Sequence, residues 1–431
     1  FSPGDGKIAL VENGQLFLHD KGDNNAALGV GALGLNTTGA QNTALGGAAL
    51  GSNTTGNYNT ALGLSALGGN DTGASNTAIG RLALNQNQSG GSNTAVGDSA
   101  LLKNNSSSST AVGFEALRNN TSGTYNTALG AITLHSNTTG GSNTSVGFQA
   151  LYHNTTGTNN TAVGADTLTS NTTGIGNIAI GSSALNFNTG GYYNIAIGTA
   201  TLQGNTTASD NIAIGKFALD SLTAGGANIG IGTSAGYYAT NSSNSIFIGN
   251  TGLDTDSATI RIGTESTQQS TFIAGINGIN VSGAAVMVDS NGQLGVTSSS
   301  RRYKEDIASM PDMSAMLTKL RPVTFHYKKA YDDGTHQLQY GLIAEEVADV
   351  MPYLTVFNKA GQPETVKYHL LPSFLLEGFQ EQQRTIATQA HKIDAQAGEL
   401  ASLRGEVERM KALMARLDRR LAAAEPGARD N

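Results

Sequence analysis

The chain of 431 residues contains no cysteine and no tryptophan, and it has no proline between Pro3 and Pro311. Without cysteine it forms neither disulfides nor thiolate metal sites, so its stability must come from other contacts. Aromatic residues make up 6% of the chain whereas glycine occurs 56 times, which does not suit an ordinary large hydrophobic core. No apolar run approaches the roughly 20 residues of a membrane-spanning helix. These absences favour a repetitive protein without membrane insertion.

Charge is scarce in one part of the chain. Residues 1–297 contain 7 Lys+Arg and 14 Asp+Glu, whereas residues 298–431 contain 18 of each. The formal net charge of −7 therefore arises entirely before residue 298. An acidic excess of this kind argues against binding to nucleic acid through its phosphates. The change in composition divides the chain near residue 298.

Residues 25–249 repeat with a period of 17. A glycine that closes an Asn-Thr-Ala-Leu-Gly unit marks each repeat, and one spacing of 16 separates Gly97 from Gly113. Asparagine stands four residues before the marker in nearly every repeat, with Ser109 and Ser245 as exceptions. So strict a period predicts a solenoid whose coils stack and cannot bury their apolar faces alone. The markers are Gly29, Gly46, Gly63, Gly80, Gly97, Gly113, Gly130, Gly147, Gly164, Gly181, Gly198, Gly215, Gly232 and Gly249.

Each repeat is expected to contain a short strand and a turn. In each strand the residues that stand three and one before the marker glycine lie on the same face. In an early repeat they are Thr43 and Leu45, and in a late repeat they are Ile195 and Ile197, so this face becomes more apolar along the chain. The residue between them is small, which indicates close approach of another backbone, either from a second chain or from tightly packed coils. The Ala-Leu pair after the marker favours a single helical turn. Asn-Thr-Thr-Gly is expected to form a corner in which Asn and Gly adopt positive φ.

Several short motifs in the repeats match functional signatures. Gly29, Gly31 and Gly34 satisfy the spacing of a dinucleotide-binding loop, but sister repeats lack it and no βαβ unit surrounds it. The Asn-Thr-Thr triplets match glycosylation acceptors, although a structural corner already explains their recurrence. No pair of histidines has ligand spacing, so neither a cofactor nor a metal is expected. The triplets begin at Asn36, Asn53, Asn137, Asn154 and Asn171, and the histidines are His19, His135 and His153.

Residues 250–297 predict a β stem whose short strands bury their apolar side chains against the strands of other copies of the chain. Alternating segments at 259–263, 272–276 and 286–288 are separated by turn signals at Asn277-Gly278 and Asn291-Gly292. Residues 298–373 predict a small α+β domain, with a strand within 320–327 and a strand leading into a helix within 340–347.

Residues 374–431 predict a long helix that forms a coiled coil. From Phe379 an apolar residue returns every seven positions over about six heptads, with one irregular step at Ala397, Leu400 and Leu403. The alternative is an amphipathic helix packed on its own domain, but six heptads exceed what a small domain can cover. Pro426-Gly427 is expected to end the helix. The heptad residues are Phe379, Ile386, Ile393, Leu400, Val407, Met414 and Leu421, and the alternate seam contains Ala390, Ala397, Leu403, Met410 and Leu417.

Two parts of the chain resemble known families. The Asn-x-Ala-Ile-Gly coil resembles the head repeat of trimeric autotransporter adhesins, a β-roll, and long Asn-Thr-Thr-Gly arrays are similar to those of phage-type tail fibres. The order of motifs after residue 298 resembles the peptidase S74 family, the intramolecular chaperone domain of endosialidase tailspikes and other phage fibres. These motifs are the junction 298–307, the two strand segments, Val366-Lys367-Tyr368, Leu370-Leu371-Pro372 and the closing coil.

The S74 resemblance implies a self-cleaving dyad at the junction. By position, Ser299 is the nucleophile, Lys304 is the general base, and the bond between Ser298 and Ser299 is cut. A serine hydroxyl needs a base, and a lysine serves as one only where burial or neighbouring cations favour its neutral form. Arg301 and Arg302 are such neighbours. The enzyme class implied is at most a serine endopeptidase that turns over once on its own chain.

Together these features predict a mainly β, homotrimeric fibre. After an N-terminal segment (1–24) come a β-solenoid or β-roll of about 14 repeats (25–249), a β stem (250–297), a chaperone domain (298–373) and a trimeric coiled coil (374–431). Its partners are expected to be its own copies and a host-surface glycan or receptor, in an extracellular setting on a virion tail or bacterial surface. The alternative is a cell-surface adhesin or secreted filament that keeps its chaperone domain. A glycan-degrading tailspike is disfavoured because no paired carboxylates stand out.

Overall fold

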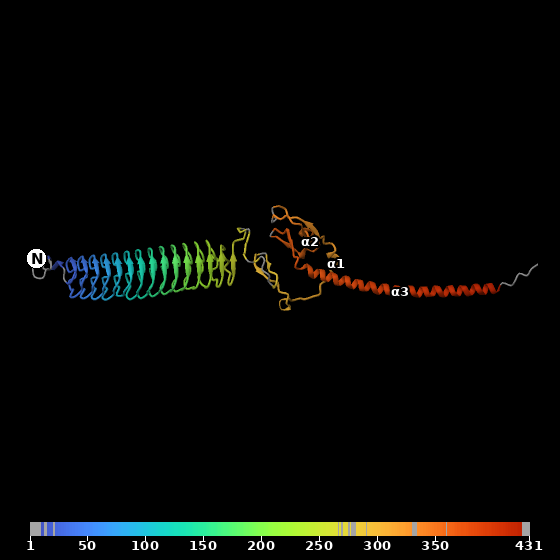
Figure 1. Ribbon diagram of the computed structural model, residues 1–431, viewed down its shortest axis with the longest axis horizontal. Helices are drawn as coiled ribbons and strands as arrows, with labels where there is room; N and C mark the ends of the chain where they lie inside the picture. The colour runs from blue at the N-terminus through green and yellow to red at the C-terminus, as the bar shows by residue number, and fades with distance from the viewer. Residues whose placement is uncertain are drawn as a thin grey trace, which may run out of the picture. The chain divides into compact units, whose positions relative to one another are not determined.

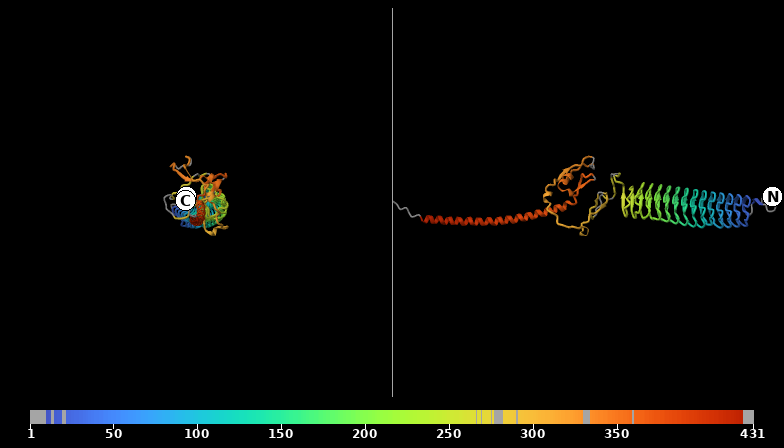
Figure 2. Two further views of the ribbon diagram at one scale, coloured as in Figure 1. Left: turned by 90° about the vertical axis from the view of Figure 1, so that its right-hand side faces the viewer. Right: turned by 180° about the vertical axis from the view of Figure 1, so that it is seen from behind.

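The computed structural model describes residues 10–12, 15–19, 22–265, 267–268, 270–274, 276, 282–289, 291–329, 334–358 and 360–424. The chain divides into two compact units, Phe1–Ile279 and Asn280–Asn431. The first is a stack of coils, and the second contains the helices α1, α2 and α3 (Figure 1; Figure 2). No helix among the described residues is long and apolar enough to cross a membrane.

The first unit is a parallel β-solenoid, which confirms the predicted fold class. Strands of three residues pair in register with the next coil, so that Thr43 lies opposite Thr60 and Leu45 opposite Leu62. An antiparallel hairpin, β1 (Leu10–Glu12) and β2 (Gln15–His19), pairs with the first ladder strand and covers that edge. The ladder strands are β3 (Ala26–Leu28), β4 (Thr43–Leu45), β5 (Thr60–Leu62), β6 (Thr77–Ile79), β7 (Thr94–Val96), β8 (Thr110–Val112), β9 (Thr127–Leu129), β10 (Thr144–Val146), β11 (Thr161–Val163), β12 (Ile178–Ile180), β13 (Ile195–Ile197), β14 (Ile212–Ile214), β15 (Ile229–Ile231), β16 (Ile246–Ile248) and β17 (Ile260–Ile262).

The small middle residue of each strand points into the coil. Ala44 is 1% exposed, whereas Leu45 beside it is 41% exposed. The alanines form one buried cluster with the Ala-Leu pairs of the turns. The small residue is therefore explained by tight packing within a single chain, and the two flanking residues of each strand face outward.

The predicted helical turn after the marker glycine is wrong. Ala48 and Leu50 have φ values of 54° and 51°, and the same pair of left-handed residues recurs along the array. A right-handed helical turn requires negative φ. The left-handed turn directs Leu50 into the interior, where it is fully buried. The marker itself must be glycine because Gly46 has a φ of 133° and a Cβ there would lie 2.5 Å from the Gly63 carbonyl oxygen.

The Asn-Thr-Thr-Gly segment does bend, but the expected positive φ at Asn and Gly is wrong. The left-handed residue lies further on, at Tyr58 in the second such corner. Asn53 is buried, and its Nδ2 donates to Asn36 Oδ1 at 2.9 Å and to the Gly56 carbonyl at 3.1 Å. Gly56 is required by space, since a Cβ there would overlap Asn53 Oδ1 and the Gly73 carbonyl. The triplet asparagines are buried, so they are not accessible glycosylation acceptors.

A second column of buried asparagines precedes the strands. The backbone N–H of Asn59 donates to Asn42 Oδ1 at 2.9 Å, and Asn59 Nδ2 donates to the Gly73 carbonyl at 2.9 Å. The carbonyl of a corner glycine such as Gly56 accepts from both columns, and the second column also gives a partner to the buried N–H groups before the strands. The first column is interrupted at the 16-residue coil, where Asn87 Oδ1 has no partner among the described residues.

The ladder continues beyond Gly249, because β17 pairs with β16. The interior row changes there from Ala213 to Gly230, Phe247 and Arg261. Phe247 is fully buried, and Arg261 holds Asp256 with Nε–Oδ2 and Nη2–Oδ1 distances of 2.6 and 2.7 Å. Burial raises the pKa of Asp256, but the hydrogen bonds from Arg261 and from the Leu253 N–H outweigh it and lower that pKa overall.

The strand expected at 272–276 is wrong for the residues that the structure describes there. Phe272 is 95% exposed, and the described residues of this segment pair with no strand. The turn expected at Asn277-Gly278 lies outside the described residues. The turn at Asn291-Gly292 is confirmed, and it joins β18 (Met287–Val288) to β19 (Leu294–Gly295).

The rest of the second unit is a small α+β fold with one long helix. The predicted strand at 320–327 and the strand-to-helix segment at 340–347 are confirmed. Its core contains Met313, Val347, Met351, Leu354 and Val366. The elements are η1 (Arg301–Tyr303), α1 (Ser314–Leu317), β20 (Val323–Phe325), β21 (Gln339–Gly341), α2 (Ala344–Val350), η2 (Pro352–Leu354), β22 (Thr355–Phe357), β23 (Pro363–Val366) and α3 (Leu371–Ala424).

Only the start of α3 packs on this core among the described residues. Leu371 and Phe374 lie against it, and Glu377 Oε2 accepts a hydrogen bond of 3.0 Å from the Met313 N–H. From Phe379 onward the heptad side chains are exposed. The helix continues unbroken through the irregular heptad step, and its predicted end at Pro426-Gly427 lies outside the described residues.

Candidate self-processing site

Ser299 and Lys304 lie on either side of one 3-10 turn, η1. The Ser300 hydroxyl begins this turn by accepting from the Arg302 N–H at 3.4 Å, and the Lys304 N–H closes it on the Arg301 carbonyl at 3.2 Å. The chain is extended again at Lys304, with φ −126° and ψ 136°. Because the turn folds the chain back, Lys304 Nζ lies 3.2 Å from Ser299 Oγ.

This distance permits proton transfer between the two groups. General acid–base pairs work at heavy-atom separations of about 2.6–3.2 Å. Both side chains are exposed to solvent in the single chain, and Lys304 donates the hydrogen bond. A charged ammonium has donors but no acceptor, so it cannot take a proton from serine. The chain therefore provides the geometry of a dyad, and a base at this position needs a less hydrated environment.

The neighbours of the dyad are tied to the turn. Arg302 Nε donates to Ser300 Oγ at 3.3 Å, and its guanidinium lies 5.6 Å from the centre of the Tyr303 ring. The Ser298 hydroxyl accepts from the Ser300 N–H at 3.4 Å, which folds the predicted scissile bond toward the turn. Sequence reasoning missed Ser300 as the residue that shapes the site. A serine directly before a short helical segment is the signal that was available.

Polar contacts between distant parts of the chain stabilise the α+β fold. Arg321 forms an ion pair with Glu346, whose hydrogen bond lowers the pKa of that carboxyl group. The Tyr368 hydroxyl accepts from the Leu342 N–H at 2.8 Å, and Gly341 leaves the space for it, since a Cβ there would lie 2.7 Å from that oxygen. The Val366-Lys367-Tyr368 motif thus joins β23 to β21.

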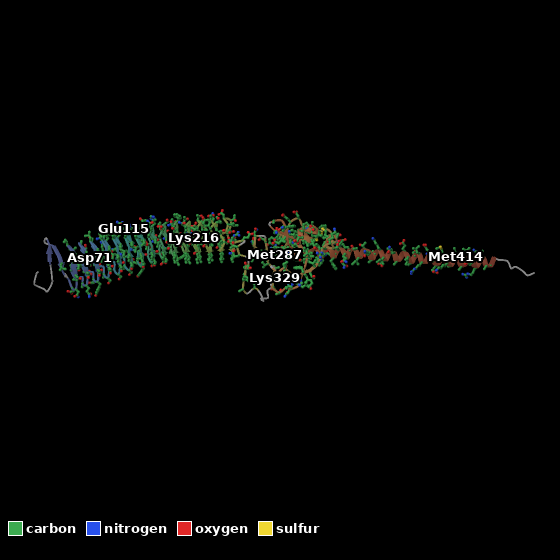
Figure 3. The ribbon with its side chains drawn as sticks, turned by 90° about the horizontal axis from the view of Figure 1, so that it is seen from above. Asp71, Glu115, Lys216, Met287, Lys329 and Met414 are labelled. Atoms are coloured by element: carbon green, nitrogen blue, oxygen red, sulfur yellow. The ribbon has the colours of Figure 1, made fainter. Side chains whose placement is uncertain are left out.

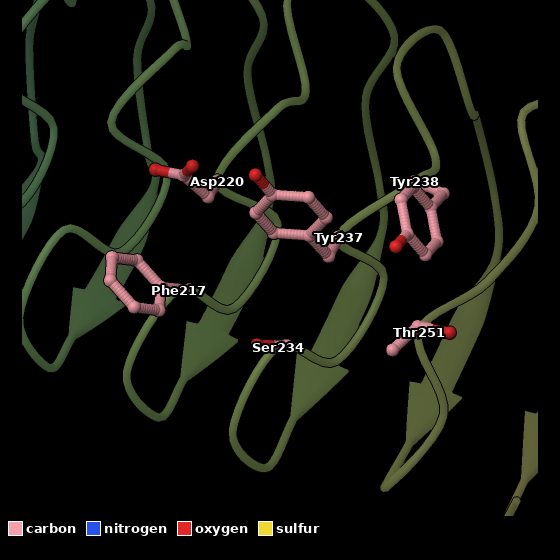
Figure 4. Close-up of a pocket in the computed structure, with 6 residues that line it drawn as sticks. All are labelled: Phe217, Asp220, Ser234, Tyr237, Tyr238 and Thr251. Carbon is pink, nitrogen blue, oxygen red and sulfur yellow. The ribbon is translucent and has the colours of Figure 1, made fainter.

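A second feature lies on the solenoid. A shallow cavity of about 320 Å³ spans three successive coils, and Figure 4 shows the residues that line it, with the hydroxyl end of Tyr237 on the side of Asp220. Asp220 Oδ1 has no hydrogen-bond partner in the described part of the chain, and burial raises the pKa of this carboxyl group. No group of three His, Asp or Glu residues that could hold a metal occurs in the described ranges. The cavity is lined by Phe217, Asp220, Ser234, Tyr237, Tyr238 and Thr251.

Comparison with known proteins identifies the segment that contains the dyad. Residues 299–356 match the family described as chaperone of endosialidase, peptidase S74. The match begins at Ser299, the residue after the predicted scissile bond. No curated protein and no solved structure matches the chain. A β-solenoid followed by a segment of this family fits a tail-fibre-like protein, and the family's link to phage tail fibres agrees with an extracellular or virion setting.

Proposed function

We propose that this chain is the subunit of a homotrimeric, tail-fibre-like protein in which residues 299–431 assemble the trimer and then cut themselves away between Ser298 and Ser299. The observation that carries the self-cleavage is the 3.2 Å separation of Lys304 Nζ and Ser299 Oγ at the first residue of the matched segment. The helix α3 supports the trimer, because its heptad side chains remain exposed in the part of the chain that the structure describes.

The exposure of the heptad seam supports assembly through α3. The seven side chains that recur every seven residues are 44–64% exposed, although all are apolar. Parallel coiled coils bury such a row by inserting each residue between residues of the partner helices. The seam residues and their exposed fractions are Phe379 57%, Ile386 50%, Ile393 63%, Leu400 53%, Val407 44%, Met414 64% and Leu421 64%.

The proposed cleavage proceeds through an ester. Lys304, when neutral, takes the proton from Ser299 Oγ, which attacks the carbonyl carbon of Ser298. The proton then passes to the Ser299 amide nitrogen, which leaves as the free amine while an ester joins Ser298 to the Ser299 hydroxyl oxygen. One water hydrolyses the ester and gives a Ser298 carboxylate and a free Ser299 hydroxyl. Burial by neighbouring copies favours a neutral lysine, so cleavage is expected to follow assembly.

Mass spectrometry of the purified full chain tests the dyad. The wild type should yield one fragment that ends at Ser298 and one that begins at Ser299, once trimers have formed. Ser299→Ala and Lys304→Ala should each remain full-length trimers, whereas Ser309→Ala, a matched control at an exposed serine outside the η1 turn, should still be cut. Intact chains in correctly assembled wild-type trimers after prolonged incubation would overturn the proposal. The second unit would then be a retained trimerisation cap, as in a surface adhesin or secreted filament.

We also propose that the fibre binds a host-surface glycan or receptor. The cavity between Phe217 and Thr251 supports this, because its aromatic rings and its unpartnered Asp220 carboxylate suit the apolar faces and hydroxyl groups of a sugar. Incubation with capsular or O-antigen polysaccharide distinguishes binding from hydrolysis, and neither outcome bears on the dyad.

A further inference from the structure

The outward face of the β-ladder is apolar or neutral over its whole length. In every strand from β3 to β17 the two outward residues are uncharged. Charged residues lie elsewhere on the coils, for example Asp71, Glu115 and Lys216 (Figure 3) and the exposed pair Arg81–Asp98, whose Nε–Oδ2 distance is 2.8 Å. One face of the solenoid is thus free of charge while the others carry the normal polarity of a protein surface.

This face also changes in composition along the solenoid. The first outward residue is threonine in each strand from β4 to β11 and isoleucine in each strand from β12 to β17. The second is leucine, isoleucine or valine from β3 to β17. Ile178, Ile197 and Ile248 are 37%, 36% and 38% exposed, and Ile262 is 70% exposed. A contiguous apolar surface of this kind marks an interaction site.

The size of the face suits a stable interface. Fifteen strands spaced about 4.8 Å apart form a ladder about 70 Å long, and three residues span about 10 Å. The resulting area of about 700 Å² is close to the roughly 800 Å² that each partner contributes to a standard protein interface.

We infer that this face joins copies of the chain to one another, parallel and in register, with Ile178–Ile262 as its most apolar part. The inference rests on the proposed trimer and names the surface that holds its solenoids together. Parallel, in-register packing places isoleucine rows against isoleucine rows and threonine rows against threonine rows, whereas antiparallel packing would place threonine against isoleucine. The coiled coil imposes the same orientation, because each heptad residue meets its own copies.

Self-cleavage makes such a surface necessary. If the bond between Ser298 and Ser299 is cut, α3 leaves with residues 299–431, and the solenoids must stay together through contacts of their own. The neutral face provides these contacts without like-charge repulsion between identical chains.

The absence of cysteine allows a direct test by cross-linking. Ile197→Cys in the full chain should be joined efficiently to its own copy by a bismaleimide with a two-carbon linker, since packed sheets lie about 10 Å apart. Thr189→Cys is the matched control. It places the thiol at an exposed corner, in the coil adjacent to the coil that contains β13, and it should not be joined to its own copy. Co-expressed, differently tagged Ile197→Cys and Ile248→Cys chains test the register, because three coils separate these positions by about 14 Å.

Light scattering on the same samples separates this inference from the proposed trimer. Trimers that are not joined at Ile197 would overturn the packing face and leave the trimer standing. Monomers would overturn the trimer itself. Joining of Ile197 to Ile248 as efficiently as of Ile197 to Ile197 would overturn the register. Circular dichroism should match that of the wild type in every variant, because each replaces an outward side chain.

Discussion

The two units of the chain are stabilised in different ways. In the solenoid every coil hydrogen-bonds to the coils beside it, and the interior repeats the same alanine, leucine and asparagine columns. In the second unit a small core of five buried residues supports a helix of 54 residues, most of which extends beyond that core. A coil therefore needs only its neighbours in the same chain, whereas the apolar seam in the distal part of α3 stays exposed in the described part of the chain.

This difference bears on what a chaperone is needed for. All described pairs of the β-ladder join strands of one chain, mostly 17 residues apart, so no exchange of strands between chains is required to form a coil. Alignment of the copies is the harder problem, because successive coils are nearly identical and a slip by one coil changes few contacts. If α3 forms the proposed coiled coil, its irregular heptad step would favour one register of the copies, and the chain would carry that register to the solenoids.

Disrupting the α3 seam should have the largest effect. Ile386→Asp combined with Ile393→Asp places six carboxylates in the centre of the trimer and removes six isoleucines, which should cost on the order of 5 kcal/mol or more per trimer. Light scattering is expected to show monomers. Thr388→Asp combined with Ala395→Asp adds the same charges two residues further along the helix, off the seam, and should leave trimers. Trimers of the seam variant would show that association does not depend on α3.

Removing one asparagine of the solenoid should have a smaller and local effect. Asn143 Nδ2 donates to the Gly157 carbonyl at 2.9 Å, and Asn143 Oδ1 accepts from the Asn160 N–H at 3.0 Å. Asn143→Ala leaves the Asn160 N–H buried without a partner, while the Gly157 carbonyl keeps only the 3.1 Å hydrogen bond from Asn154 Nδ2, and the loss should cost about 2–4 kcal/mol. Asn143→Ser should cost less, because the natural Ser109 accepts from the Asn126 N–H through its hydroxyl at 3.4 Å.

Hydrogen exchange locates that loss. Amides of the changed coil and its immediate neighbours should exchange faster, while those of α2 keep their protection. Faster exchange in α2 as well would contradict the view that solenoid stability is local.

The sequence predicted the periodic features of the fold and missed the conformations that periodicity does not encode. A strict repeat of 17 identifies a solenoid, and a heptad identifies the exposed seam of α3. The same repeat could not show that Leu50 is left-handed, because a leucine ordinarily disfavours positive φ and only the packing of successive coils imposes it. The repeat also could not show that the triplet asparagines are buried, because their hydrogen-bond partners are the equivalent residues of the next coil.

At the candidate site, spacing and resemblance selected Ser299 and Lys304, and the structure places their side chains within hydrogen-bonding distance. The turn that brings them together depends on the Ser300 hydroxyl and on Arg302, which no spacing rule singled out. Lys304 is exposed to solvent in the single chain. Its proposed burial by neighbouring copies would be a property of an assembly, so a single sequence could indicate the pair but not its activation.

The smallest effect is expected at the end of the ladder, where the periodic interior gives way to the Asp256–Arg261 pair. The pKa of Asp256 lies below its ordinary 3.8 in the folded chain, so its carboxylate stabilises the fold above that pH and loses this effect as the pH falls through the lowered pKa. Asp256→Asn should therefore lower stability by about 1–3 kcal/mol at pH 7 and by progressively less below about pH 4. Thermal unfolding of both proteins at pH 7 and in acid measures the difference.

Asp220→Asn is the control of opposite sign. Burial raises the pKa of Asp220, so its protonated form is favoured in the fold, and the resulting stability is present below pH 3.8 and lost as the pH rises through the raised pKa. At pH 7 the neutral asparagine should leave stability unchanged or slightly higher. Equal losses at both positions at pH 7 would show that the coil tolerates no change of carboxylate, and the Arg261 hydrogen bonds would then not explain the stability of the last coil.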